Sequence, residues 1–175
     1  VRVAVKYSDH LGALKLIAVF DKLKEPDALF HYLQAVVNYS TEPEVHFRYL
    51  DASVKLQQLS EVERVTRESN YYDPERVKGL LMRAKLKDPR PLINVCDRFG
   101  YVDELVRYML KRDQIRFVEG YVTKVNPMRA PQVAGVLLDM KVELAVIMRM
   151  LMAVKHHLAL GELCDEVMKN GGRLK

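Results

Sequence analysis

The residues best suited to binding a metal lie near the end of the chain: His156, His157 and Cys164. Adjacent side chains project about 100° apart around a helix, so the two imidazoles do not readily ligate one ion. The chain contains neither a Cys-x-x-Cys nor a His-Glu-x-x-His spacing, which are the patterns typical of zinc sites. The sequence therefore predicts no metal site and no cofactor.

A cysteine beside an aspartate, Cys96 with Asp97, is the closest approach to a nucleophilic site. A catalytic thiol needs a base within hydrogen-bond reach, and no candidate base lies near Cys96 in the sequence. Neighbouring carboxylates on a helix diverge and are typical of solvated charge or of charges at helix ends; such pairs are Asp103–Glu104 and Asp165–Glu166. We predict that the chain has no catalytic residues and is not an enzyme.

Both cysteines, Cys96 and Cys164, have apolar neighbours and no motif spacing. A free cysteine packs as a small apolar side chain, and disulfides are rare in reducing compartments. We therefore expect two buried thiols. Tyr71 and Tyr72 directly precede Asp73; they could form a binding platform, but their position favours closure of a junction between two helices.

The formal net charge is +5, and a basic balance is typical of proteins that bind nucleic acids or anionic membranes. Basic and acidic residues alternate, however, as in Glu61, Arg64, Arg67 and Glu68, which favours a solvated helical surface. A helical-repeat nucleic-acid binder reads bases from a fixed position in each repeat. No Arg, Asn or aromatic residue recurs at the spacing of the predicted helices, so we expect no nucleic-acid partner.

The composition is that of a folded chain, because 49% of the 175 residues are hydrophobic and 29% are charged. No stretch approaches the ~18 to 20 apolar residues that cross a bilayer, and no signal peptide is visible. We expect a soluble protein. The chain begins with Val1 and both ends have helix-like sequence, so we expect a segment excised from a longer protein.

Helical periodicity runs through nearly the whole sequence. Apolar residues recur at i, i+3, i+4 and i+7, as in Val77, Leu80, Leu81 and Ala84, which places them on one face of a helix. Residues 1–7 are predicted to be the tail of an earlier helix. Further helices are predicted to start near residues 11, 26, 43, 59, 74, 89, 101, 114, 127, 142 and 159, which gives about 11 or 12 helices.

Proline and glycine mark the ends of these helices. Proline suits the first turn of a helix and disfavours α conformation in the residue before it, and the prolines at 26, 43, 74, 89 and 127 fit that position. Asp73, Asp88 and Asn126 are predicted to cap the first-turn amides. Gly100 is predicted to be a left-handed stop.

Many short helices favour an all-α solenoid of antiparallel hairpins, in which neighbouring hairpins bury one another's apolar faces. A four-helix bundle would need fewer and longer helices. Residues 142–154 are apolar on most sides, which predicts a helix held between neighbours. Gly79, Gly120 and Gly135 lie inside predicted helices, and close approach of two helices is the expected reason.

The central two thirds of the chain contain long and idiosyncratic strings, which include Val-Asn-Tyr-Ser at 37–40, Glu-Pro-Glu-Val-His-Phe at 42–47 and Tyr-Asp-Pro-Glu-Arg-Val-Lys at 72–78. These strings resemble the leg of the clathrin heavy chain. The likeness continues at 61–65, 67–70, 91–93, 95–100, 121–122, 124–127, 135–139, 162–163 and 166–167. Residues 141–157 match less well, and Pro89 and Arg90 stand where the family has other residues.

The resemblance implies a right-handed α-solenoid, with residues 1–175 as one continuous segment that holds most of one clathrin repeat and the start of the next. It implies a structural scaffold in the distal leg of a three-legged coat protein, on the cytoplasmic face of coated pits and vesicles. The implied partners are other heavy-chain legs. Light chains and cargo adaptors would bind outside this segment, and membranes would be reached only through adaptors. An α-solenoid subunit of a vacuolar sorting or tethering complex is the alternative.

Overall fold

The computed structural model describes residues 1–171 and divides into two compact units, Val1–Val95 and Cys96–Lys175. The first unit contains α1 (Arg2–Lys6), α2 (Ser8–Leu11), α3 (Ala13–Leu23), α4 (Pro26–Val36), α5 (Pro43–Lys55), α6 (Leu59–Glu68), α7 (Pro74–Ala84) and the start of α8 (Arg90–Phe99). The second contains α9 (Val102–Leu110), α10 (Ile115–Gly120), a π-helical turn (Tyr121–Val125), a 3-10 turn (Pro127–Arg129), α11 (Ala130–Asp139), α12 (Leu144–Ala153), a second 3-10 turn (Lys155–His157) and α13 (Leu160–Gly171).

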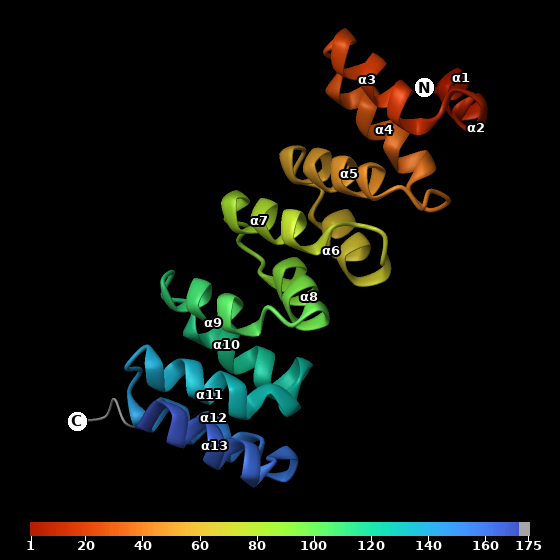
Figure 1. Cartoon of the computed structure of the whole chain (residues 1–175). Helices are drawn as coiled ribbons and strands as arrows, with labels where there is room; N and C mark the ends of the chain where they lie inside the picture. Colours follow the sequence, from red (N-terminus) through yellow and green to blue (C-terminus); the bar gives the residue numbers. More distant parts are fainter. Residues whose placement is uncertain (172–175) are drawn as a thin grey trace. The chain divides into compact units, whose positions relative to one another are not determined.

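Within each unit, successive helices fold back on one another as short hairpins that follow the order of the chain (Figure 1). No β-strand occurs in residues 1–171. The predicted all-α class and the series of helix hairpins are confirmed, and each unit is a length of α-solenoid. That residues 1–175 form a single continuous segment, with most of one repeat and the start of the next, stays a prediction.

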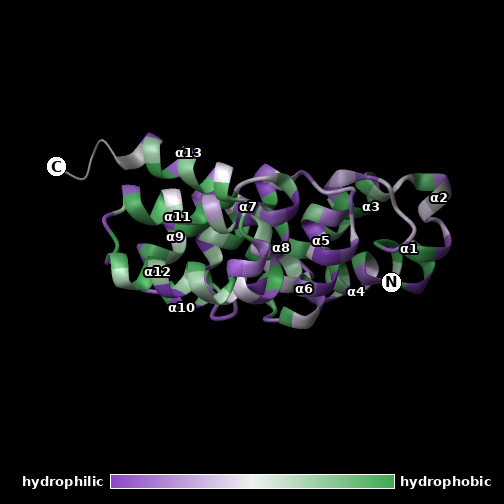
Figure 2. Ribbon diagram, turned by 90° about the horizontal axis from the view of Figure 1, so that it is seen from below, coloured by the Kyte–Doolittle hydropathy of each residue, from purple (hydrophilic) through white to green (hydrophobic). Residues whose placement is uncertain are grey.

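The apolar stripes of the helices form the cores of the two units. In Figure 2, hydrophobic and hydrophilic colours alternate along the individual helices, as amphipathic helices require. Completely buried side chains in the first unit include Leu33, Tyr49, Leu50, Val62 and Val77. Those in the second unit include Leu105, Val106, Met109, Val122, Val133 and Leu137.

The predicted helix starts agree with the structure to within two or three residues, because proline and apolar periodicity are local signals. Proline occupies the first turn of α4, α5 and α7. Gly100 has a φ of 79°, which confirms the left-handed stop after α8. The short helix α2, the π turn and the 3-10 turn at Lys155–His157 were not predicted.

Two of the three predicted caps are confirmed. Oδ1 of Asp73 accepts hydrogen bonds from the backbone amides of Glu75 and Arg76 at 3.0 and 3.1 Å, and Oδ1 of Asp88 accepts one from the amide of Arg90 at 3.0 Å. The prediction for Asn126 is wrong, since its side chain makes no capping hydrogen bond. It donates to Asp97 instead.

Close helix approach does not account for two of the helical glycines. A Cβ at Gly79 would meet only the flexible guanidinium of Arg83, at 3.6 Å, and a Cβ at Gly120 would meet nothing within 4 Å. The prediction is therefore wrong at these positions. Gly135 is buried in α11, and the reason for glycine there stays a prediction.

Helix α12 is less enclosed than its sequence predicts. Ile147 and Met150 are buried, but Leu144, Met148 and Met152 are half or more exposed. These three residues follow one another at i, i+4 and i+8 along one face of the helix. The prediction that residues 142–154 are held between neighbours is wrong for this face.

Among residues 1–171, no helix is long and apolar enough to span a bilayer.

Candidate functional site

Ion pairs between arginines and carboxylates join helices that are two places apart in the chain. They connect α3 to α5, α5 to α7 and α6 to α8 in the first unit, and α9 to α11 and α10 to α12 in the second. The partners lie 27 to 32 residues apart in the sequence, about the length of one helix hairpin. We call these five pairs the arginine bridges: Asp21–Arg48, Glu44–Arg76, Glu63–Arg90, Arg107–Asp139 and Glu119–Arg149.

The bridges are close contacts at the protein surface. The N–O distances are 2.8 Å for Arg76, 2.6 Å for Arg107 and 2.5 Å for Arg149. The side chain of Asp139 is 15% exposed, whereas that of Asp21 is 48% exposed. Partly exposed pairs contribute about 1 kcal/mol or less each. Each bridge therefore adds only a small preference for the observed alignment of two hairpins, while apolar burial supplies most of the stability.

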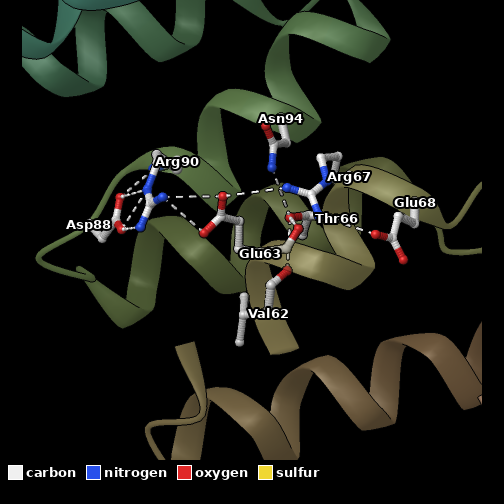
Figure 3. A network of polar contacts seen from close by, with 8 residues as sticks. All are labelled: Val62, Glu63, Thr66, Arg67, Glu68, Asp88, Arg90 and Asn94. Atoms are coloured by element: carbon white, nitrogen blue, oxygen red, sulfur yellow. Dashed lines mark hydrogen bonds and ion pairs between the residues drawn. The ribbon is translucent and has the colours of Figure 1, made fainter. Parts of the chain in front are cut away.

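The bridge between α6 and α8 belongs to a larger polar network (Figure 3). Arg90 lies 2.5 Å from Asp88 and 3.2 Å from Glu63, so one guanidinium contacts both carboxylates. Arg67, one turn further along α6, lies 3.8 Å from Glu63 and 3.1 Å from Glu68. The hydrogen bond from the Arg90 side chain lowers the pKa of Asp88 below its ordinary value, so Asp88 stays ionised further into acid than an unpaired aspartate.

A buried hydroxyl links the same two helices. Thr66 is completely buried, and its Oγ1 donates to the backbone carbonyl of Val62 at 2.8 Å. The same oxygen accepts a hydrogen bond from Nδ2 of Asn94 on α8 at 3.5 Å (Figure 3). The hydroxyl is therefore already satisfied within α6, and the longer contact with Asn94 adds a polar link from α6 to α8.

A second network ties α5 to α6. Tyr49 is completely buried, and its hydroxyl donates to Glu61 at 2.8 Å. Arg64 lies 2.8 Å from Glu61 and also donates to Asn38 at 3.1 Å. Burial raises the pKa of Tyr49 to about 12, and the hydrogen bond to Glu61 adds to this effect. The hydrogen bond from Arg64 lowers the pKa of Glu61.

Asp97 holds both ends of the π turn in the second unit. Its Oδ1 accepts a hydrogen bond from the hydroxyl of Tyr121 at 2.6 Å and another from Nδ2 of Asn126 at 2.8 Å. Arg129 lies 3.9 Å away. Burial raises the pKa of Tyr121 well above its ordinary value, and the hydrogen bond to Asp97 raises it further. This arrangement explains why Asn126 does not cap the following helix.

The two cysteines and the two adjacent histidines have different environments in the structure. Cys96 is completely buried, as predicted, but Cys164 is exposed on α13, so that prediction is wrong. His156 and His157 lie in a 3-10 turn. Within residues 1–171, no group of three or more His, Cys, Asp or Glu side chains could hold a metal ion.

Tyr71 and Tyr72 differ in their environment. Tyr72 is 3% exposed and its hydroxyl donates to the backbone carbonyl of Thr66 at 2.9 Å, which confirms that this ring closes the junction between α6 and α7. Tyr71 is half exposed, and its ring centroid lies 5.6 Å from that of His46.

The arginine bridges were missed in the sequence, where no recurrent arginine was recognised. Their signal is an arginine and a carboxylate separated by one hairpin length, which can be identified only once the helix starts are placed. Each arginine also has acidic residues closer in the sequence, so the spacing alone does not select the partner. The bridges add surface contacts between helices two places apart, each of which favours the observed alignment by a small amount.

Residues 4–144 match the family described as a region in clathrin and VPS. The whole chain is 47% identical to "Clathrin heavy chain 2" of Homo sapiens, 46% identical to the clathrin heavy chain of Drosophila melanogaster and 42% identical to a probable clathrin heavy chain of Schizosaccharomyces pombe. All 175 residues are covered in each comparison, but they span only 10 to 11% of each relative.

Proposed function

Because the chain belongs to the family of the region found in clathrin and VPS proteins, we propose that it is a structural scaffold segment of a clathrin coat. The observation that carries this proposal is the identity of 42 to 47% to clathrin heavy chains across all 175 residues. The segment would form part of the leg of a heavy chain, in its distal portion.

The structure supports a mechanical role. A row of hairpins held by nearest-neighbour interfaces is stiff locally, and small adjustments can be spread over many joints. In this chain, the five bridged helix pairs lie over buried apolar side chains and are held by exposed or partly exposed arginine bridges. Such a leg resists large deformation, and its partly hydrated ion pairs tolerate small changes in the angle between hairpins.

The alternative within the same family is a subunit of a vacuolar sorting or tethering complex, since the family description names VPS as well as clathrin. The identities to clathrin heavy chains favour the coat. A nucleic-acid binder and an enzyme are less well supported. The arginine side chains that recur between hairpins are engaged with carboxylates of the same chain, rather than arranged as a surface for phosphates.

The proposed partners are other heavy-chain legs in a lattice on the cytoplasmic face of coated pits and vesicles. Light chains and cargo adaptors are proposed to bind outside this segment, and a membrane would be reached only through adaptors. Contacts between legs would be individually weak and numerous, so the lattice gains its strength from multiplicity.

An exchange experiment tests the scaffold function. Residues 1–175 replace the matching segment of a clathrin heavy chain, and cage assembly is measured by sedimentation and electron microscopy. We expect cages in a yield close to that of the unmodified heavy chain. A chimera with Val95→Asp, which charges a completely buried position, serves as the control for a misfolded segment. A folded chimera that trimerises but forms no cages contradicts the proposal.

A further inference from the structure

An open groove of about 420 Å³ crosses α9, α11 and α13 in the second unit. Five carboxylates from the three helices line it: Asp103, Asp139, Glu162, Asp165 and Glu166. Its two cations are already engaged, because Arg107 pairs with Asp139 at 2.6 Å and Lys169 with Glu166 at 2.9 Å. The groove therefore has an excess of negative charge.

Helix α13 supplies most of this charge in an ordered way. Glu162, Asp165, Glu166 and Lys169 occur at i, i+3, i+4 and i+7, so they share one face of the helix. Glu162 and Asp165 are exposed. Asp103 on α9 is exposed as well, and it accepts a hydrogen bond from the neutral side chain of Gln132 at 2.8 Å. These three carboxylates are placed to receive cations from outside the groove.

The connection between α7 and α8 in the first unit has the opposite charge. Arg83, Lys85 and Lys87 are exposed there, within five residues of one another. We call this segment, residues 83–87, the basic turn. The acidic residue that follows it, Asp88, is held by Arg90 at 2.5 Å and so does not neutralise the turn. Basic side chains complement the end of a helix, but two of these three lie beyond the last residue of α7, Ala84.

We propose that the basic turn of one copy of this chain docks into the acidic groove of a second copy, as a contact between neighbouring legs. The inference rests on the scaffold function proposed above and names surfaces through which it acts. A second copy is the fitting partner because one chain carries both complementary surfaces. The basic turn of each copy then binds one neighbour, and its acidic groove binds the same neighbour or another one. Such contacts can repeat through a lattice.

The contact would be weak in isolation and sensitive to salt. Charges at an exposed interface are screened over about 8 Å at physiological ionic strength, and each exposed pair adds little affinity. In a coat, many such contacts act together, so weak pairs suffice. Weak and polar contacts also allow a lattice to be taken apart.

Zero-length crosslinking tests the contact directly. A carbodiimide joins the amine of Lys87 to a carboxylate that touches it, and a mixture of light- and heavy-isotope chains distinguishes links between copies from links within one. We expect mixed-isotope links from Lys87 to Glu162 or Asp165 that decline as salt is raised. If no link between copies joins these sites at low salt, the proposal is overturned.

Charge reversal provides the matched control. The turn variant carries Arg83→Glu and Lys87→Glu, and the groove variant carries Glu162→Lys and Asp165→Lys; all four positions are exposed, so both variants should keep their helical circular dichroism. Because these substitutions also remove the groups that carbodiimide joins, the variants are read by self-association in analytical ultracentrifugation at low salt. We expect self-association to weaken about tenfold in each variant alone and to return when the two variants are mixed. If the mixture shows no recovery, or if only the groove variant loses self-association, the groove takes another partner and the proposal is wrong.

The same variants separate this inference from the scaffold function. Both are introduced into the heavy-chain chimera described above. If the parent chimera assembles and each variant lowers the cage yield, both proposals hold. If the parent assembles and the variants assemble equally well, the contact between turn and groove is wrong while the scaffold function stands.

Discussion

Asp97 accepts a hydrogen bond from the hydroxyl of Tyr121, 24 residues further along the chain, with an O–O distance of 2.6 Å. The same oxygen accepts a second hydrogen bond from Asn126, so one carboxylate fixes the first residue of the π turn and the residue that follows it. Single π turns inside helical regions are rare and are often tied to function. Here the π turn, Tyr121–Val125, directly continues α10, and Asp97 binds the residues at its two ends.

Removal of Asp97 should destabilise the chain more than removal of the hydroxyl it binds. Tyr121 is 1% exposed, so Asp97→Ala leaves a buried hydroxyl without its acceptor and should cost about 2–3 kcal/mol. Tyr121→Phe should cost about 1 kcal/mol, since Asp97 keeps Asn126 and its access to water. Urea unfolding of both single variants and the double variant gives their coupling energy, which we expect to be about 1 kcal/mol or more.

The control for this cycle is Asp165→Ala, which removes an exposed carboxylate of the same unit and should change the free energy of unfolding by about 0.5 kcal/mol or less. Equal losses for Asp97→Ala and Tyr121→Phe, with no coupling between them, would show that the hydrogen bond does not hold the turn.

The role of Asn126 could not be predicted from the sequence, although the helix starts could. Proline at 26, 43 and 74 acts on the residues next to it, so its effect can be predicted from the local sequence. The cap expected at Asn126 was likewise predicted from the residues next to it, but the carboxylate of Asp97, 29 residues away in the sequence, accepts a hydrogen bond from its side chain instead. Only the packing of α8 against the π turn decides between the two.

Which side chains of α13 are buried could not be predicted from the local sequence either. Cys164 has apolar neighbours in the sequence, yet it is exposed together with Leu160 and Met168 on α13. Apolar composition predicts that a helix has a buried face, but it does not show which neighbour covers it. The arginine bridges were missed for the same reason, since their partners are set by the alignment of hairpins.

The bridge between Arg107 and Asp139 should make a measurable, salt-dependent contribution to stability. Arg107→Met keeps the aliphatic part of the side chain but removes the guanidinium that pairs with Asp139, which is 15% exposed. We expect a loss of about 1 kcal/mol in urea unfolding at low salt and a smaller loss at high salt. Arg116→Met is the control, because Arg116 is exposed on α10 and no arginine bridge includes it. If both substitutions have the same effect, the bridge contributes nothing.

A glycine at the end of α3 should stabilise the chain. Lys24 closes this helix in the left-handed conformation, with φ of 56° and ψ of 37°, where a side chain costs roughly 1–2 kcal/mol relative to glycine. Lys24→Gly should therefore raise the free energy of unfolding by about 1 kcal/mol. The matched control is Lys22→Gly, which lies inside the last turn of α3 and should lower it by about 0.5–1 kcal/mol. Destabilisation by both variants would mean that the left-handed end is not strained.

The buried Tyr49 should make the chain sensitive to alkaline pH. Its pKa is raised from 10.0 to about 12 in the folded chain, because burial and the contact with Glu61 disfavour the phenolate. The folded chain therefore holds this proton more tightly than the unfolded chain does. The resulting stability is fully present below pH 10 and is lost as the pH rises from 10 towards 12.

Tyr49→Phe removes the group whose proton is held more tightly in the folded chain. Above pH 10, the free energy of unfolding of the variant should therefore fall less steeply with pH than that of the parent chain, and the two slopes should differ by up to about 1.4 kcal/mol per pH unit. Urea unfolding at several pH values between neutrality and the alkaline limit measures the slope. Tyr39→Phe is the control, because Tyr39 is 89% exposed and its substitution should leave the slope unchanged. Equal slopes for the parent chain and Tyr49→Phe would mean that Tyr49 ionises as easily in the folded chain as in the unfolded chain. The hydrogen bond from Tyr49 to Glu61 would then not contribute to the contact between α5 and α6.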